Sequence, residues 1–265
     1  MKKVCEECVS TKPESEALEA RYAQQSHIYY KGSVCETDSI GHAEPPLARS
    51  PTELVVHAAD GFIPLWRQDV ILRWRFQERS LAIFKQPEAA KQYLRQILAN
   101  GIMLWRDSVP IKFREVETGD TWDFEYVFNW QDKCIPNGGC TLASAFFPDG
   151  GRHELNVYPK LFEQSEQEQA ETMAHETGHI FGLRHFFAKI SEKRWRSEIF
   201  GDHAPFSIMN YGPNSFMTEN DRKDLATLYR KAWSGELKEI NGTPVQLVSP
   251  FSAFRPAFEQ LAAMH

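Results

Sequence analysis

The stretch HETGHIFGLRH, residues 175–185, decides how the rest of this 265-residue chain is interpreted. His175 and His179 are four positions apart, so on a helix their imidazoles project from one face and can share one cation. Gly182 tolerates a positive φ, which can end the helix and bring His185 round as a third ligand. Three neutral imidazoles would leave the fourth position of a tetrahedral zinc ion open.

An open position is typical of catalytic zinc, because water bound there has its pKa lowered to about 7 and becomes a nucleophile. Glu176 follows His175 directly, and its carboxylate can take the proton of that water and pass it to a leaving amine. The alternative is an amphipathic helix with solvated histidines. The five fixed positions of HExxHxxGxxH arise by chance in a chain of this length with a probability of about one in ten thousand, which favours the zinc interpretation.

The motif HExxHxxGxxH followed by a methionine turn resembles the metzincin signature. The matching residues are His175, Glu176, His179, Gly182 and His185. In SIMNY, Met209 stands twenty-four residues after His185, and the resemblance implies an apolar floor formed by this methionine beneath the imidazoles. Tyr211 matches a tyrosine of astacins and serralysins that can stabilise the oxyanion, with a packing role as the alternative.

The segments PIKFREV, ASAFFPDGG and DLATLYR resemble strands and the final helix of matrix metalloproteinase catalytic domains, and the likeness spans roughly residues 65–233. It implies an extended protein or peptide substrate, held through backbone hydrogen bonds by an edge strand. It also implies that residues 212–216 form one wall of the pocket for the residue after the scissile bond. The substrate-cleft residues expected from this resemblance are Leu142, Ala143, Ser144, Pro213 and Phe216.

The chain also departs from that family pattern. Matrix metalloproteinases carry a loop rich in histidine and aspartate for structural zinc and calcium, and residues 116–141 supply no such ligand set. We therefore expect one catalytic Zn²⁺ and no structural zinc or calcium. Cys134 and Cys140 bracket a Pro/Gly-containing loop, and a disulfide or two free thiols are equally open. His153 and His203 are spare histidines, more often solvated or hydrogen-bonded than metal ligands.

The patterning predicts an α/β (α+β), metzincin-like fold: a twisted mixed sheet of about five strands with two long helices, and a smaller C-terminal subdomain with the Met turn and a final helix. Alternating apolar residues indicate the strands, and Ser165 with Glu168 forms a capping-box signature before the motif helix. The expected strands lie within 70–76, 111–116, 123–130, 142–148 and 153–159, and the expected helices within 87–105, 165–182 and 218–232.

We expect three regions along the chain. Residues 1–50 are a polar, flexible leader that serves as a prosegment or an export signal; Cys35 within it is a candidate zinc-blocking thiolate, with an ordinary linker cysteine as the alternative. Residues 51–233 form the catalytic domain. Residues 234–265 are an extension in which the Asn241–Gly242 pair favours a hairpin, followed by a final helix.

Composition limits the partners and the location. Thirty Lys and Arg against thirty-six Asp and Glu give a net charge of -6, so neither nucleic acid nor an anionic membrane is an expected partner. The start MKKVCEECVS lacks the apolar centre of a signal peptide, and the sequence predicts no transmembrane segment. We expect a soluble protein made in the cytoplasm, with export by a leaderless or specialised route as a hypothesis. The oligomeric state is open.

The sequence therefore predicts a zinc-dependent endopeptidase. A catalytically silent, zinc-stabilised peptide-binding module is the alternative, although such a module would be free to lose Glu176. A host-targeted effector protease would have the same chemistry and a different biological setting.

Overall fold

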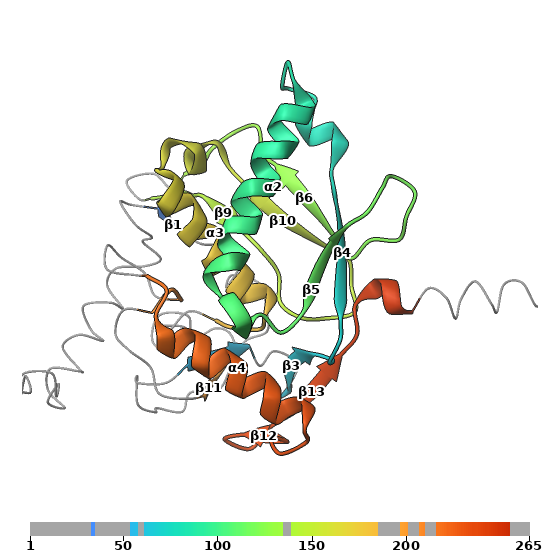
Figure 1. The fold of residues 1–265 in the computed structure, drawn as a ribbon, viewed down its shortest axis with the longest axis vertical. Coiled ribbons are helices and arrows are strands. Elements are labelled where there is room, and N and C mark those ends of the chain that lie inside the picture. The colour runs from blue at the N-terminus through green and yellow to red at the C-terminus, as the bar shows by residue number, and fades with distance from the viewer. Residues whose placement is uncertain are drawn as a thin grey trace, which may run out of the picture.

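The computed structural model describes residues 33–34, 54–57, 61–134, 139–184, 197–200, 207–209 and 216–254, with backbone alone for 33–34, 54–57 and 197–200. Its main element is a five-stranded sheet with the strand order β5-β4-β6-β10-β9. In Figure 1 the long helix α2 crosses this sheet and α3 lies beside α2. The strands are β4 (Ile71–Phe76), β5 (Lys112–Glu115), β6 (Phe124–Phe128), β9 (Ala143–Ser144) and β10 (His153–Val157).

Four strands of this sheet are parallel, and β9 alone runs antiparallel to its neighbour β10. The expected mixed sheet of about five strands is therefore confirmed. Among the described strands β9 has β10 alone as a neighbour and ends the sheet, so the segment that carries Ala143 and Ser144 is an edge strand. It is shorter than the alternation within 142–148 predicts.

The alternation in β4 reflects a face packed against α2 (Pro87–Leu104). Leu72, Trp74 and Phe76 are buried, while the residues between them are partly exposed. The Arg95 guanidinium of α2 lies 5.1 Å from the centre of the Phe76 ring, which shows that this face looks toward the helix. The apolar face of the strand and the apolar stripe of the helix thus form one core.

The helix α3 (Glu166–Ile180) packs closely on α2. Its start has the predicted capping box, in which the Ser165 hydroxyl accepts from the Glu168 backbone N–H and the Glu168 carboxylate accepts from the Ser165 N–H. The two helices meet at Gly101, where a Cβ atom would lie 2.5 Å from the Cβ of Met173. Gly101 therefore sets how near α3 comes to α2.

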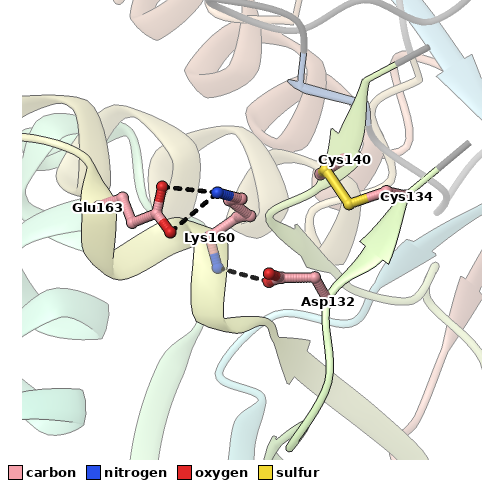
Figure 2. Close-up of a disulfide and its surroundings, with 5 residues drawn as sticks. All are labelled: Asp132, Cys134, Cys140, Lys160 and Glu163. Atoms are coloured by element: carbon pink, nitrogen blue, oxygen red, sulfur yellow. Dashed lines mark hydrogen bonds and ion pairs between the residues drawn. A yellow bond between two sulfur atoms is a disulfide. The ribbon is translucent and has the colours of Figure 1, made fainter. Parts of the chain in front are cut away.

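A disulfide between Cys134 and Cys140 closes the hairpin of β7 (Lys133–Cys134) and β8 (Cys140–Thr141), which resolves the two alternatives left open for these cysteines (Figure 2). The backbone of Lys160 donates to the Asp132 carboxylate over 2.9 Å and ties the base of the hairpin to the segment after β10. β1 (Ser33–Val34) runs parallel to β8 on its other side. Because β8 leads directly into β9, the hairpin anchors the edge strand.

The remaining elements lie below the main sheet in Figure 1. The Asn241–Gly242 pair forms the predicted hairpin turn, with positive φ angles of 51° and 81°. β13 pairs in parallel with β3, so the C-terminal extension shares a sheet with the first part of the region expected to form the catalytic domain. The strands and long helix here are β2 (Leu54–His57), β3 (Ile63–Trp66), β11 (Ser197–Phe200), α4 (Glu219–Trp233), β12 (Glu239–Ile240) and β13 (Thr243–Val248).

Four short 3₁₀ helices complete the described elements: η5 (Glu78–Leu81), η6 (Arg106–Ser108), η7 (Pro159–Glu163) and η8 (Phe251–Ala253). The final helix that the sequence predicts after the C-terminal hairpin is represented within the described residues by η8 alone, and residues 255–265 lie outside them. No helix in the described part of the chain is both long and apolar enough to cross a membrane.

The contact at Gly101 predicts the effect of Gly101→Ala. The new methyl group would overlap Met173 of α3, and overpacking of this kind costs about 1–3 kcal/mol, which exceeds the gain of roughly 1 kcal/mol in helix propensity. We expect a lower free energy of unfolding in urea. Gln92→Ala on the exposed face of α2 is the control and should change it little. A Gly101→Ala variant as stable as the parent would contradict this packing.

We expect the disulfide to contribute measurably to the free energy of unfolding. Cys134 and Cys140 are six residues apart, and closing a loop of that size in the unfolded chain corresponds to about 2 kcal/mol in the chain-entropy model. The double variant Cys134→Ser/Cys140→Ser should unfold at lower urea concentration. The urea midpoint of the parent protein in a phosphine reductant should shift to that of the double variant. Equal midpoints for the oxidised parent, the reduced parent and the double variant would show that the disulfide contributes nothing to stability.

Candidate metal centre

The helix α3 carries the motif histidines and ends where the sequence predicts. The Leu183 N–H donates to the Gly178 carbonyl over 2.9 Å, and the Gly182 N–H donates to the His179 carbonyl over 2.8 Å. Gly182 has a φ of 90°, so this pair of bonds forms a Schellman-type C-cap that needs a residue tolerant of positive φ. The chain is turned back sharply just before His185.

Three buried donors from other elements hold the second half of α3 in place. Trp105 donates its indole N–H to the Ala174 carbonyl over 2.9 Å, and Trp66 of β3 donates to Ile180 over 2.7 Å. The Tyr229 hydroxyl of α4 donates to Phe181 over 3.0 Å, and burial raises the pKa of this hydroxyl, which keeps its proton in place. The Ile180 and Phe181 carbonyls at the helix end are thereby satisfied, and the bond from Trp105 adds a contact further along that helps to fix the helix in position.

The two motif histidines on α3 converge on one point. Both side chains are fully buried, their ring planes are nearly perpendicular at 82°, and their Nε2 atoms are 3.0 Å apart. Glu176 lies between them in sequence and is 1% exposed. The predicted pairing of His175 and His179 on one helical face is what the structure shows.

The other ring nitrogen of each histidine faces a backbone carbonyl. His175 Nδ1 lies 2.8 Å from the Ile208 oxygen, and His179 Nδ1 lies 2.7 Å from the Leu183 oxygen. A carbonyl can only accept, so each Nδ1 must carry the proton, and in a neutral imidazole the Nε2 then has a lone pair. Two lone pairs facing each other at 3.0 Å repel unless a cation or an additional proton lies near both.

This donor set fits zinc. Zn–N bonds of about 2.0–2.1 Å at a tetrahedral angle place two ligand nitrogens roughly 3.3 Å apart. The observed separation of the two Nε2 atoms is 3.0 Å, close to that spacing. Neutral imidazoles whose Nδ1–H groups bond to carbonyls are also the usual state of metal-ligating histidines.

Several residues assigned from the sequence lie outside the described part of the chain, namely His185, Tyr211 and Pro213. Among the described residues, no group of three or more His, Cys, Asp or Glu side chains is placed to hold a metal ion. The third ligand and the tyrosine therefore stay predictions.

Met209 is buried against the motif helix. A Cβ atom at Gly178 would lie 2.4 Å from the Met209 sulfur, so the thioether reaches α3 in the turn between the two histidines. Gly178 was not singled out from the sequence, and it is needed here because any larger residue would displace the methionine.

The expected cleft residues differ in their exposure to solvent. Leu142, Ala143 and Ser144 are buried, at and just before the edge strand β9, which packs on α3. The Leu142 carbonyl accepts from the Tyr158 N–H over 2.9 Å, which attaches the start of the edge strand to the sheet. Phe216 is 47% exposed just before α4.

Of the two spare histidines, His153 is hydrogen-bonded. Its Nε2 lies 2.7 Å from the Asp149 carboxylate, and its ring stacks on Phe146 with centres 4.3 Å apart. This is the alternative that the sequence favoured over metal binding. His203 lies outside the described residues.

Sequence reasoning missed the groups that orient the histidines. The carbonyls of Leu183 and Ile208 belong to apolar residues, so residue type carries no signal for their role. The contacts of Asp221 with the turn at 207–209 join segments that are apart in the sequence, so they depend on tertiary structure.

Part of the chain resembles known proteins. Residues 66–191 match the family model described as Matrixin. Stromelysin-3 of Homo sapiens is 25% identical over 170 residues, which cover 61% of this chain and 32% of that protein. Stromelysin-3 of Mus musculus is 25% identical over 166 residues, which cover 59% of this chain and 31% of that protein. The match thus spans about a third of the length of these relatives.

Among solved structures, that of myroilysin is similar with a TM-score of 0.45 and 15% sequence identity, covering 66% of this chain and 98% of that one. With the five-stranded mixed sheet, these matches show that residues 66–191 of the chain are similar to a matrixin-like metzincin domain.

Proposed function

We propose that this protein is a zinc-dependent endopeptidase that cleaves extended protein substrates. The observation that carries the proposal is the pair of buried imidazoles on α3, each with its Nδ1 held by a carbonyl and its Nε2 turned toward the other. Glu176 lies on the same helix next to His175. The matrixin match of residues 66–191 supports the same conclusion.

The metal ligands in this proposal are His175, His179 and His185. A zinc ion bound by them would act as a Lewis acid that polarises the substrate carbonyl and lowers the pKa of water. His175 and His179 contribute their Nε2 lone pairs, since both Nδ1 protons are donated to carbonyls. The C-cap at Gly182 supports the role of His185, because it reverses the chain three residues before that histidine.

Glu176 is the general base of the proposed reaction. Its carboxylate takes a proton from the attacking water and delivers it to the leaving amine, so the peptide bond breaks without a covalent intermediate. Tyr211 donates a hydrogen bond to the oxyanion of the tetrahedral intermediate. Met209 supports the imidazoles from below through its contact with α3 at Gly178.

The substrate in this proposal binds along the outer edge of β9. Among the described strands Ala143 and Ser144 pair with β10 alone, so an extended peptide can add as a further strand through backbone hydrogen bonds. Leu142 begins this edge, and Pro213 with the exposed Phe216 forms a wall of the pocket beyond the scissile bond. Residues 51–233 constitute the catalytic domain, residues 1–50 a leader and residues 234–265 an extension.

Replacing the general base is the direct test. Glu176→Gln keeps the size of the side chain and removes its basicity, so kcat/KM on a peptide library should fall by about 10²–10⁴-fold while zinc content stays at that of the parent. Glu166→Gln, an exposed position in the first turn of the same helix, is the matched control and should keep full activity. A zinc-loaded parent protein that cleaves no peptide would favour the silent binding module.

Metal removal gives a second test. Zinc that binds the folded chain alone adds about 4 kcal/mol of stability at a free concentration one thousand times its Kd. A chelator should therefore lower the melting temperature and abolish cleavage, and added zinc should restore both. His179→Ala should melt at the same temperature with and without the chelator. If that variant responds as the parent does, the zinc is bound elsewhere.

A further inference from the structure

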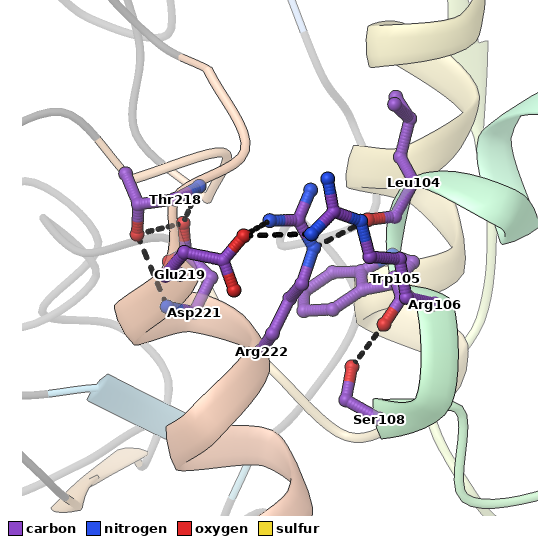
Figure 3. Close-up of polar contacts among 8 residues, drawn as sticks. All are labelled: Leu104, Trp105, Arg106, Ser108, Thr218, Glu219, Asp221 and Arg222. Atoms are coloured by element: carbon purple, nitrogen blue, oxygen red, sulfur yellow. Dashed lines mark hydrogen bonds and ion pairs between the residues drawn. The ribbon is translucent and has the colours of Figure 1, made fainter.

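The carboxylate of Asp221 accepts more hydrogen bonds than a helix cap requires. Asp221 lies in the first turn of α4 and is 3% exposed. Its Oδ2 accepts from the backbone N–H and the hydroxyl of Thr218, over 2.8 and 2.7 Å, which completes the capping box at the helix start (Figure 3). Two more donors come from a distant segment, the hydroxyl of Ser207 and the backbone N–H of Ile208.

These extra donors belong to the turn that contains Met209. Ser207 donates its hydroxyl proton to Asp221 Oδ1, and the Ile208 N–H lies 3.4 Å from Oδ2. The Ser207 oxygen also accepts from the Met209 N–H over 3.0 Å. A buried carboxylate is costly unless several donors surround it, so Asp221 and the turn at 207–209 hold each other in place.

The same turn supplies the acceptor for a proposed zinc ligand. The Ile208 carbonyl oxygen lies 2.8 Å from His175 Nδ1, and all atoms of this connection are buried. A continuous path of hydrogen bonds therefore runs from Asp221 through Ser207 and Ile208 to His175. Nothing comparable links the Thr218 side of the cap to the histidines in the described residues.

We propose that Asp221 is a positioning residue of the metal centre. It acts through Ser207 and Ile208 to fix the carbonyl that binds the Nδ1–H of His175, and it thereby selects the tautomer whose Nε2 lone pair faces the metal. This inference rests on the proposed function, since it requires His175 to be a zinc ligand.

The start of α4 has a separate attachment that does not involve this carboxylate. Arg222 donates to the Leu104 carbonyl at the end of α2 over 2.7 Å, and Glu219 pairs with Arg106 over 2.9 Å (Figure 3). Loss of the Asp221 carboxylate should therefore leave α4 docked on η6 and on the end of α2. The effect of such a variant can be assigned to the turn at 207–209.

The experiment compares Asp221→Asn with Thr218→Ala, measuring zinc affinity of the full chain by competition with a chromogenic chelator. Asn cannot accept at both positions, so we expect its Kd for zinc to rise by about 10–100-fold. Thr218→Ala removes the side-chain cap and keeps the Ser207 and Ile208 contacts, so its affinity should stay within about threefold of the parent, although both variants lose some melting temperature. Ser207→Ala, which leaves the cap whole, should weaken zinc binding too.

A second readout concerns the tautomer itself. Nitrogen NMR of the metal-free protein at neutral pH should show His175 protonated at Nδ1 in the parent and in Thr218→Ala, and a mixture of tautomers in Asp221→Asn. Should Asp221→Asn fail to fold, Ser207→Ala replaces it in both measurements.

The outcomes separate the two proposals. A parent protein that binds no stoichiometric zinc would overturn the proposed function, and with it the role of Asp221. A parent that binds zinc, with Asp221→Asn and Ser207→Ala binding equally tightly, would overturn the positioning role alone and leave the endopeptidase proposal intact. If Thr218→Ala and Asp221→Asn weaken zinc binding equally, Asp221 acts only as a helix cap and the positioning role is wrong.

Discussion

The arrangement of the proposed metal centre depends on one constraint, that two histidines of a single helix must both turn their Nε2 atoms toward the same point. A helix alone leaves each ring free to rotate and to change tautomer. The backbone carbonyls of Leu183 and Ile208 remove that freedom by accepting from the two Nδ1 atoms. Two turns from different parts of the chain are therefore as necessary as the helix that carries the ligands.

The rest of the structure can be understood as support for that helix. Gly101 lets α2 approach, and three buried donors from β3, α4 and the end of α2 bind carbonyls in its second half. The edge strand is attached at its start by the disulfide hairpin. The disulfide between Cys134 and Cys140 closes this hairpin covalently, and a covalent link of this kind constrains the unfolded chain.

Much of the fold could be predicted from the sequence because local patterns and tertiary needs agree. The alternation of Leu72, Trp74 and Phe76 is both a strand pattern and the core face beneath α2. The capping boxes at Ser165 and Thr218 mark the starts of α3 and α4 because their hydrogen bonds join residues three apart. The alternation within 142–148 was less informative, since only Ala143 and Ser144 pair as a strand.

What the sequence determined by itself is the type of the proposed ligands and the helix that presents two of them. Helical spacing places His175 and His179 on one face, and Gly182 ends the helix because it can adopt a positive φ. What only the tertiary structure decided is how those ligands are oriented. The acceptor for His175 comes from Ile208, thirty-three residues away, and its position depends on Asp221, thirteen residues further still. Contacts between backbone carbonyls and distant side chains leave no periodic trace in a sequence, because any residue can supply the carbonyl.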